Sequence, residues 1–451
     1  MGRRLYRVVS VKKLIAPRRL SAWIIVALCE LVALGLIATW ATPGHAAAVS
    51  FGGRQILVDG RRFIMKGVCY SPTPIGLAGD LPPSGDYFTT TYRSIYDRDL
   101  PLMRQMGVNC LRVYGWSSTD DHTEFLDRAY NGGKQPIYVV INRWIDPATD
   151  WSSPAAITAI KNKWQSIVLA ARGHPAVLGY AIGNELNFAN GGNPAFWSAI
   201  NDIAGTVRTA DPYHLITTPL GDGGLITQIQ TYDSVMTNLN CWAVQMYRGS
   251  NFGTLFASYG AASTKPLLVT EFGLDAFNAT TGQEYSNNAA LPAIYLDSLW
   301  NDILTHTNIV SGGAVFAWSD EWWKSGAAST HEAGGWNSAA FPDGRGDEEW
   351  WGIHRISAGD PNMLEPRAAA GVLTGLWFVP PAKPALSMPT FTANGHSQTA
   401  VTGTPGYTYA VWSSVDLQSW TPRQTNLPPF TFIDTNAAVL PRQFYRAMLV
   451  P

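Results

Sequence analysis

Eight short apolar runs alternate with segments of helical periodicity along residues 63–318, and this alternation constrains the fold more than any other feature. Residues 177–182, for example, carry no charged side chain, which is typical of a parallel strand buried on both faces. Eight strand–helix units over about 320 residues predict an α/β fold, the (β/α)8 TIM barrel. The expected strands are residues 63–70, 108–114, 137–141, 177–182, 214–218, 243–247, 267–270 and 313–318, and the clearest helices are 93–106, 154–171 and 194–209.

A doubly wound parallel sheet is the alternative for the same alternation. A dinucleotide-binding sheet of that kind carries a glycine-rich turn after its first strand. This chain has Cys69-Tyr-Ser-Pro72 there, which disfavours the alternative. Residues 55–65, with Asp59-Gly60 as a two-residue turn, predict a small antiparallel ribbon that closes the bottom of the barrel.

Two of the apolar runs end abruptly in a glutamate beside a glycine. They are Tyr180-Ala-Ile-Gly-Asn-Glu-Leu-Asn187 and Leu267-Leu-Val-Thr-Glu-Phe-Gly273. A carboxylate at the C-terminal tip of a barrel strand contributes little to the core, but it faces the mouth where barrel enzymes bind substrates. Two such groups supply the pair of carboxyls that glycosidic bond cleavage needs.

These strings resemble the catalytic barrels of the large clan of retaining glycoside hydrolases, over about residues 55–377. The clan includes the β-galactosidase and β-glucuronidase type of catalytic domain and the β-1,3-glucanosyltransferases. Its acid/base belongs to an Asn-Glu pair after the fourth strand, and its nucleophile is a glutamate after the seventh. The resemblance implies that Glu185 is the acid/base and Glu271 the nucleophile. Glu185 must then hold a proton at rest while Glu271 stays ionised.

The resemblance also implies roles for polar residues at other strand ends. Arg112 would keep Glu271 charged, and Asn184 would hydrogen-bond the sugar 2-hydroxyl. Tyr247 would hydrogen-bond the nucleophile, although relatives often have asparagine where this chain has Gln245.

Aromatic residues are abundant, with 18 tryptophans, and flat indoles stack well on the apolar faces of sugar rings. Trp318, at the end of the eighth expected strand, would form the floor of the sugar site. Further candidates for substrate binding are Tyr70, at the end of the first strand, and Trp323, in a long loop after the eighth. That loop also holds Trp322, Trp336, Trp350 and Trp351.

The same loop contains the acids Asp320-Glu321 and Asp347-Glu348-Glu349, which compete for the acid/base role. The loop is either a solvated acidic surface or a lid that forms a subsite wall, and we favour the lid. Since its acids follow Trp318 in a polar stretch, we expect them to stay ionised. The buried run before Glu185 should instead raise the pKa of that carboxyl towards neutrality.

No cluster of His, Cys and Asp has metal-ligand spacing, so we expect no metal site and no cofactor. His331 and His354 are interpreted as structural or rim residues. A net charge of -1 gives no reason to expect a nucleic acid partner. The expected partner is a β-linked oligo- or polysaccharide.

Residues 1–48 are predicted to be a signal peptide or an N-terminal membrane anchor. Residues 1–20 hold seven Lys or Arg and no acid, and the apolar stretch 22–41 is interrupted only by Glu30. Small residues at 43–48 favour cleavage and export, to the medium, the periplasm or the cell surface. If the segment is not cleaved, membrane attachment would involve residues 22–41 alone.

The remaining chain divides into a catalytic domain, 49–378, a Pro-rich linker, 379–384, and a small β-sandwich module, 385–451. Trp412 or Trp420 would allow the module to bind carbohydrate, and a structural or surface-attachment role is equally open. Cys69, Cys110 and Cys241 remain after the N-terminal segment. Because their number is odd and each falls in an expected strand, we interpret them as buried free thiols.

Together these features predict an exported retaining glycoside hydrolase that cleaves β-glycosidic bonds. Transglycosylation of β-glucan is an alternative on the same scaffold, because the two reactions differ only in whether water or a sugar reaches the glycosyl-enzyme. An inactive carbohydrate-binding barrel is the alternative from another class. The paired glutamates disfavour it, since a binding protein does not need two opposed carboxylates.

Overall fold

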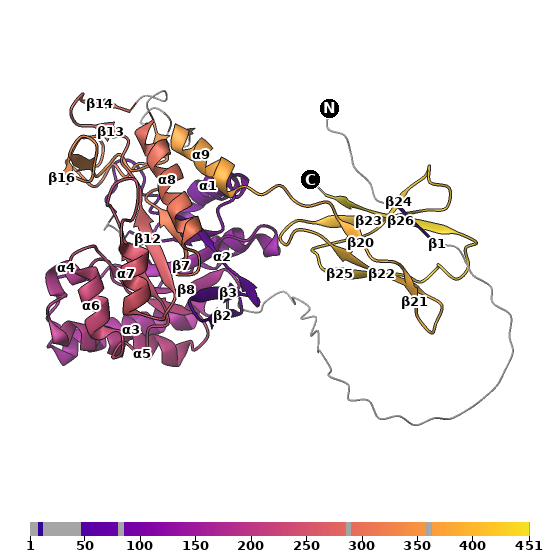
Figure 1. The fold of residues 1–451 in the computed structure, drawn as a ribbon, viewed down its shortest axis with the longest axis horizontal. Helices are drawn as coiled ribbons and strands as arrows, with labels where there is room; N and C mark the ends of the chain where they lie inside the picture. The colour runs from indigo at the N-terminus through magenta and orange to yellow at the C-terminus, as the bar shows by residue number, and fades with distance from the viewer. Residues whose placement is uncertain are drawn as a thin grey trace. The chain divides into compact units, whose positions relative to one another are not determined.

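The structure is a computed structural model that describes residues 8–11, 47–79, 85–285, 290–357, 360 and 363–450. It divides into two compact units, one with Gly44–Gly132 and Pro136–Val379, the other containing Pro380–Pro451. Figure 1 shows strands surrounded by helices in the first unit and strands alone in the second. The boundary at Val379 falls where the sequence has its proline-rich stretch.

The larger unit is a closed parallel barrel. Its sheet has the order β10-β11-β12-β15-β5-β6-β7-β8-β9, and only Thr218 separates β9 from β10 in the chain. The two ends of the order are therefore halves of one barrel strand, which closes the sheet and excludes an open doubly wound fold. The strands are β5 (Met65–Cys69), β6 (Cys110–Arg112), β7 (Tyr138–Arg143), β8 (Val177–Ile182), β9 (Leu215–Thr217) with β10 (Pro219–Leu220), β11 (Trp242–Gln245), β12 (Leu267–Phe272) and β15 (Val310–Val315). The predicted (β/α)8 barrel is confirmed.

One strand boundary was predicted wrongly. The eighth strand was expected at 313–318, but β15 begins three residues earlier and contains Gly312 and Gly313. These glycines pair with Met65 and Lys66 of β5. A β-carbon at Gly312 would lie 2.3 Å from the Met65 carbonyl oxygen, so glycine is required by the close approach of two backbones. The low strand propensity of glycine hid this start in the sequence.

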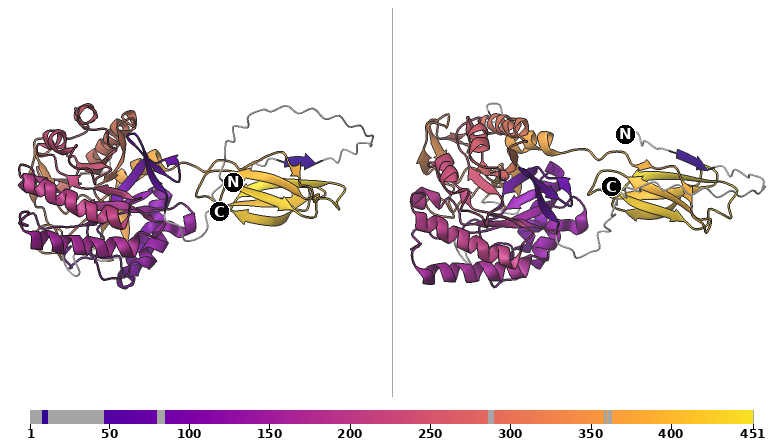
Figure 2. Two further views of the ribbon diagram at one scale, coloured as in Figure 1. Left: turned by 90° about the horizontal axis from the view of Figure 1, so that it is seen from below. Right: turned by 60° about the horizontal axis from the view of Figure 1, so that its bottom comes forward.

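Helices cover the outside of the barrel, as Figures 1 and 2 show. Local chemistry sets the start of the two longest. The Ser153 side chain accepts from the Ala156 N–H ahead of Pro154, and the Asn193 side chain accepts from the Ala195 N–H ahead of Pro194. The helices are α1 (Arg93–Met106), α2 (Thr123–Tyr130), α3 (Pro154–Ala171), α4 (Asn187–Asn190), α5 (Pro194–Ala210), α6 (Leu225–Tyr232), α7 (Leu255–Ala262), α8 (Leu291–Thr305) and α9 (Ala368–Trp377).

A three-stranded ribbon closes the amino end of the barrel. It consists of β2 (Val49–Gly52), β3 (Gln55–Val58) and β4 (Arg61–Arg62), turned at Asp59-Gly60, where both residues have positive φ. The Ile56 N–H donates to Ser311 Oγ (3.3 Å) near the start of β15. Ile56 packs with barrel-interior residues such as Leu178 and Leu268. Because this end is plugged, the opposite, carboxyl end is left for a site.

The segment after β15 folds over the barrel in short antiparallel pieces. They are β16 (Gly335–Asn337) with β17 (Arg345–Asp347), and β18 (His354–Ile356) with β19 (Leu364–Pro366); β13 (Phe277–Asn278) and β14 (Gln283–Glu284) follow β12. The Arg367 guanidinium binds Asp320 with two hydrogen bonds (2.7 and 2.8 Å) and also contacts Glu284. The predicted loop is thus an ordered cover held by buried ion pairs.

The smaller unit is a β-sandwich. One sheet has the order β1-β26-β23-β24, and in the other β20, β21 and β25 pair with β22. Its strands are β20 (Ala385–Leu386), β21 (Thr390–Phe391), β22 (Ser397–Thr402), β23 (Tyr409–Ser414), β24 (Thr421–Asn426), β25 (Phe430–Asp434) and β26 (Gln443–Leu449). The core between the sheets consists of Leu386, Val401, Val411, Phe432, Tyr445 and Ala447. The predicted all-β fold of the C-terminal region is confirmed.

The predicted N-terminal leader lies almost entirely outside the described residues, including its apolar stretch 22–41. Its one described part, β1 (Val8–Val11), pairs antiparallel with β26. Among the described residues, no helix is long and apolar enough to span a membrane. Cys69, Cys110 and Cys241 are buried and unpaired, as expected.

Candidate active site

A cleft of about 1400 Å³ opens at the carboxyl end of the barrel strands. Both glutamates line it: Glu271 lies in β12, and Glu185 follows β8. Asn184, Gln245 and Tyr247 also line it, from strands four and six of the barrel. The structure therefore brings together the two carboxyl groups and most of their predicted partners.

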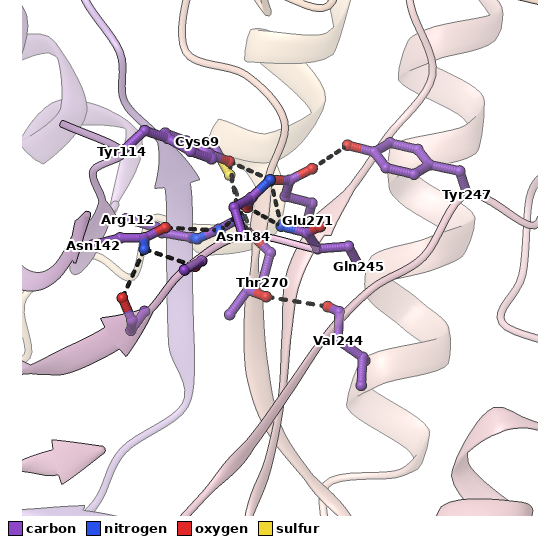
Figure 3. A network of polar contacts seen from close by, with 12 residues as sticks. Cys69, Arg112, Tyr114, Asn142, Asn184, Val244, Gln245, Tyr247, Thr270 and Glu271 are labelled. Atoms are coloured by element: carbon purple, nitrogen blue, oxygen red, sulfur yellow. Dashed lines mark hydrogen bonds and ion pairs between the residues drawn. The ribbon is translucent and has the colours of Figure 1, made fainter. Parts of the chain in front are cut away.

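The Glu271 carboxylate accepts four hydrogen bonds, three of them drawn to one oxygen (Figure 3). Oε1 accepts from Arg112 Nη1 (2.5 Å), Tyr114 Oη (2.6 Å) and Gln245 Nε2 (2.7 Å), and Oε2 accepts from Tyr247 Oη (2.8 Å). The side chain is only 8% exposed. An arginine and three further donors hold this buried carboxylate in one orientation.

Arg112 joins this carboxylate to the neighbouring strands. It is fully buried at the end of β6, and Nη2 donates to Asn142 Oδ1 (3.0 Å) and to Asn184 Oδ1. Asn142, in turn, donates to the carbonyls of Ala181 and Gly183 (2.7 and 2.9 Å) at the end of β8. One guanidinium thus fixes the position of the nucleophile candidate relative to the strand that carries Glu185.

Asn184 has its amide orientation set by two donors. Its Oδ1 accepts from Arg112 and from Gln245 Nε2 (2.7 Å), so the Nδ2 group points away from both. Within the described chain, Nδ2 has no hydrogen-bond partner, and Asn184 lines the cleft. Gln245, where relatives often have asparagine, contacts both Asn184 and Glu271 through one amide group. The longer side chain therefore still reaches the site.

Glu185 differs from Glu271 in its hydrogen bonding and its backbone conformation, and the pKa of its carboxyl is raised. Its carboxyl oxygens have no hydrogen-bond partner among the described residues, and its backbone takes a positive φ of 51°. Burial, and next the charge of Glu271, raise the pKa of Glu185 to about 8. Positive φ is uncommon for a residue with a side chain, and it occurs at active sites as well as in turns such as the one at Asp59. This environment favours the protonated form of the Glu185 carboxyl.

This raised pKa has a consequence for stability. Between about pH 4 and pH 8 the folded chain keeps a proton on Glu185 that the unfolded chain releases, so this residue makes folding less favourable as the pH rises. We expect Glu185→Gln to have a higher Tm than the wild type at pH 8 and a nearly equal one at pH 4. Thermal unfolding at the two pH values measures this. An equal Tm difference at both would contradict the raised pKa.

Arg112 is expected to be irreplaceable by lysine. A single ammonium cannot contact Glu271, Asn142 and Asn184 at once, so Arg112→Lys leaves buried acceptors without donors. We expect kcat to fall about hundredfold, with a lower Tm. Steady-state kinetics and thermal unfolding measure the two effects. Retention of wild-type kcat would show that Arg112 does not position the site.

Aromatic rings form one wall of the cleft. Phe316 packs edge-on against Tyr114, Tyr247 and Trp351, with ring centroids 5.8–6.4 Å apart. Trp351 and Trp336 also pack against Tyr247. Trp323, predicted to bind substrate, lines the same cleft. Tyr247 is therefore held both by its bond to Glu271 and by rings on its other sides.

Charged groups lie next to this wall. Lys324 Nζ contacts Glu321 (3.0 Å) and Glu348 (3.4 Å), and it lies 4.2 Å from the centre of the Phe316 ring. All of these residues line the cleft. The two carboxylates raise the pKa of Lys324 against the opposing effect of burial. The wall therefore presents one ammonium compensated by two carboxyl groups.

Two predicted substrate-binding residues do not reach the cleft. Trp318 is 1% exposed in the hydrophobic core, with its ring 4.2 Å from that of His354. Tyr70 is fully buried and donates to Asp99 (2.8 Å). Because β15 ends at Val315, three residues before the predicted end of strand eight, Phe316 is the strand-end aromatic that lines the cleft. The stacking floor predicted at Trp318 is corrected accordingly.

The five loop acids were expected to lie in a wet stretch, and this is wrong for four of them. Asp320, Glu321, Asp347 and Glu349 are at most 3% exposed. Asp320 is tied to Arg367, and the Glu349 carboxylate accepts backbone N–H groups of the cover. Burial raises the pKa of Glu321, which lines the cleft. Of the five loop acids, Glu321 and Glu348 line the cleft with Glu185, and Lys324 contacts both of them.

Histidines of the cover pack against tryptophans. His331 stacks between Trp322 (4.8 Å) and Trp350 (3.7 Å), which supports its interpretation as a structural residue. Within the described ranges, no group of three or more His, Cys, Asp or Glu could hold a metal ion.

Several residues of the site were missed in the sequence. Tyr114 lies two residues after Arg112, and period-two alternation in a strand places both on one face, so this signal was available. Asn142 similarly follows the apolar run of the third strand. Phe316 and Lys324 carry no comparable signal, because their positions depend on where β15 ends and on the fold of the cover.

No protein-family model matches the chain. Among curated proteins, it is 22% identical over 364 residues to 1,3-beta-glucanosyltransferase GAS2 of Saccharomyces cerevisiae, which covers 71% of this chain and 59% of that protein. It is 23% identical over 282 residues to 1,3-beta-glucanosyltransferase GAS5 of the same yeast, covering 58% and 54%. The chain thus spans less than two thirds of the length of these relatives.

Among solved structures, the chain resembles a GH2 beta-galacturonidase from Eisenbergiella tayi, with TM-score 0.53, 16% identity, and 73% and 54% of the two chains covered. A b-glucuronidase from Ruminococcus gnavus gives TM-score 0.55, 14% identity, and 74% and 53% coverage. At these identities the likeness concerns the fold. Together with the closed barrel, the comparisons confirm the resemblance to the (β/α)8 domains of glycoside hydrolase type.

Proposed function

We propose that this chain breaks β-glycosidic bonds by double displacement, with retention of configuration. The observation that carries the proposal is the contrast between the two carboxyl groups of one cleft. Glu271 is ion-paired and accepts four hydrogen bonds, whereas Glu185 accepts none from the part of the chain that the structure describes, and its pKa is raised to about 8. A nucleophile and a general acid need these two environments.

In the first step, Glu271 attacks the anomeric carbon while Glu185 gives its proton to the leaving oxygen, so that a covalent glycosyl-enzyme forms. Glu185 is then a carboxylate and acts as the base that deprotonates water or an acceptor hydroxyl. Attack restores free Glu271 and returns the proton to Glu185. The Asn184 Nδ2 group, with its direction fixed by Arg112 and Gln245, is the proposed donor to the sugar 2-hydroxyl.

We propose a neutral β-glucan as the substrate class. The curated relatives are named as 1,3-beta-glucanosyltransferases, whereas the structural neighbours are named for uronic acids. Recognition of a uronate requires a cation with charge to spare. Beside Glu271, Lys324 is compensated because Glu321 and Glu348 both contact it. The other described cations that line the cleft, Arg143 and Lys163, lie away from this wall, at the end of β7 and in α3. This wall favours the hydroxyl groups of a neutral ring.

Hydrolysis and transfer to a second sugar use the same residues. The names of the curated relatives favour transfer, and the chemistry of the cleft permits Glu185 to activate water as well as a sugar hydroxyl. An inactive binding barrel is the less favoured proposal. It would have no use for a carboxyl group that is kept protonated and unbonded beside a fixed carboxylate.

The test is a screen of purified protein against β-linked glycans and aryl glycosides, with β-1,3-glucan and a matched β-glucoside and β-glucuronide included. We expect cleavage or elongation of β-1,3-gluco-oligosaccharides and no turnover of the glucuronide. Turnover of the glucuronide alone would contradict the neutral substrate class.

The stereochemical outcome is a separate prediction. Because two successive inversions occur at the anomeric carbon, the first-formed product should have the β configuration of the substrate. Proton NMR recorded in the first minutes, before mutarotation, measures this. An α product formed first would contradict double displacement, whatever the sugar.

We also propose that the chain is exported and that residues 1–48 act as the leader or anchor. Cleavage there would remove β1 (Val8–Val11) and leave the β26 edge without that partner. N-terminal sequencing of protein recovered from the medium tests the cleavage, and an intact N-terminus in the cytosolic fraction would contradict export.

A further inference from the structure

An exposed phenylalanine borders the proposed acid/base. Phe188 lies in α4, three residues after Glu185, and its N–H donates to the Glu185 carbonyl (3.1 Å). Ring and carboxyl meet above Gly221: a β-carbon there would lie 2.1 Å from Phe188 Cε2 and 2.9 Å from Glu185 Oε1. The ring is therefore beside the oxygen that would protonate the leaving group.

The backbone of two glycine residues supports the Phe188 ring. Phe188 lies over Gly221 and Gly223, where a β-carbon would come within 2.8 Å of Cδ1. Buried Asn187 joins the two segments, because its Nδ2 donates to the Gly221 carbonyl (2.9 Å) and its Oδ1 accepts the Gly221 N–H (2.8 Å). The ring is thus fixed in position, yet 61% of Phe188 is exposed.

A second exposed aromatic lies in the same cleft. Trp144 directly follows β7, the strand before the one that leads to Glu185, and it is 57% exposed. The rings around the partners of Glu271 are less exposed, since Phe316 and Trp351 are at most 5% exposed and Trp336 is 38% exposed. The two strongly exposed rings of the cleft therefore come from strand ends three and four, where the acid/base is.

We propose that Phe188, together with Trp144, binds a sugar ring on the leaving-group side of the reacting bond. The general acid protonates the leaving oxygen, so the leaving group must lie beside Glu185. A fixed, flat, apolar surface suits the C–H face of a pyranose, and burying it contributes to binding. After the leaving sugar departs, the same surface holds an acceptor sugar whose hydroxyl Glu185 deprotonates. This inference rests on the proposed function and adds that the substrate has a sugar on both sides of the bond.

The test compares substrates with and without a leaving sugar. A laminari-oligosaccharide places a sugar over Phe188, whereas the β-fluoride of a laminari-oligosaccharide releases only fluoride. We expect Phe188→Ala to lower kcat/KM for the oligosaccharide about tenfold, equivalent to about 1.4 kcal/mol. The kcat/KM for the fluoride should stay within about twofold of the wild-type value. With the fluoride as donor and an oligosaccharide as acceptor, the ratio of transfer to hydrolysis should fall by a similar factor.

Matched variants separate this site from a general effect. Trp144→Ala should lower kcat/KM for the oligosaccharide in the same way. Tyr213 is 73% exposed and does not line the cleft, so Tyr213→Ala should leave kcat/KM for both substrates unchanged. Equal losses for oligosaccharide and fluoride, or no loss for either, would overturn the inference while leaving the proposed function in place. Wild-type protein that turns over neither substrate would overturn the proposed function and the inference with it.

Discussion

Replacing Glu271 with glutamine is expected to abolish turnover, lowering kcat by on the order of 10⁴-fold or more. The amide cannot form the glycosyl ester, but its oxygen still accepts hydrogen bonds from Tyr114 and Gln245. Arg112 keeps its bonds to two asparagines. The fold and sugar binding should therefore survive, as measured by thermal unfolding and calorimetric titration with oligosaccharide. Wild-type rates in this variant would contradict the assignment.

Azide distinguishes a missing nucleophile from a damaged site. Glu271→Gly opens space on the face from which the nucleophile attacks, so azide and an activated β-glycoside should give the α-glycosyl azide, of inverted configuration. Glu321→Gly is the matched control, because Glu321 is also a buried carboxyl of the same cleft. An inverted azide product from the control, and none from Glu271→Gly, would move the nucleophile to Glu321.

Replacing Glu185 with alanine should slow natural substrates by about 10²–10⁴-fold. A dinitrophenyl leaving group hardly needs protonation, so its release should be slowed much less. The wild-type rate should fall as the pH rises through about 8, because the active form of Glu185 is the protonated one and its pKa is raised to that value. The variant should lack this basic limb.

Glu321 is the control for the acid/base as well, since burial raises its pKa too. Lys324 contacts this carboxyl at 3.0 Å and opposes the effect of burial by favouring the ionised form, so Glu321 is less suited than Glu185 to protonate a leaving group. Glu321→Gln should keep the basic limb and show no dependence on the leaving group. The opposite pattern, with Glu185→Ala unaffected, would reverse the assignment.

Much of the barrel could be predicted because its strands are buried on both faces and its helices have local start signals. The run 177–182 became β8 without a change of boundary, and Pro154 and Pro194 began their helices as expected. The eighth strand could not be placed, since Gly312 is required by a backbone contact with β5 that no local pattern encodes.

In the site, too, residues with a local sequence signal could be predicted, whereas those placed by distant contacts could not. Glu185, Glu271 and Arg112 end apolar strands, so their convergence follows from the barrel itself. Trp318 was misplaced because the apolar run continues past the end of β15 into the core. The acids of the cover were expected in water, although ion pairs such as Arg367–Asp320 and backbone donors bury them. Those partners are distant in sequence, and composition alone could not identify them.

The most direct test of the account is to trap the glycosyl-enzyme. A 2-deoxy-2-fluoro β-glucosyl or laminaribiosyl fluoride slows both steps, so the intermediate should accumulate and inactivate the protein with a stoichiometry of one. Peptide mass spectrometry should then place the added sugar on the peptide that contains Glu271, and Glu271→Gln should take up no label. A sugar attached to Glu185, Glu321 or Glu348 would contradict the central claim.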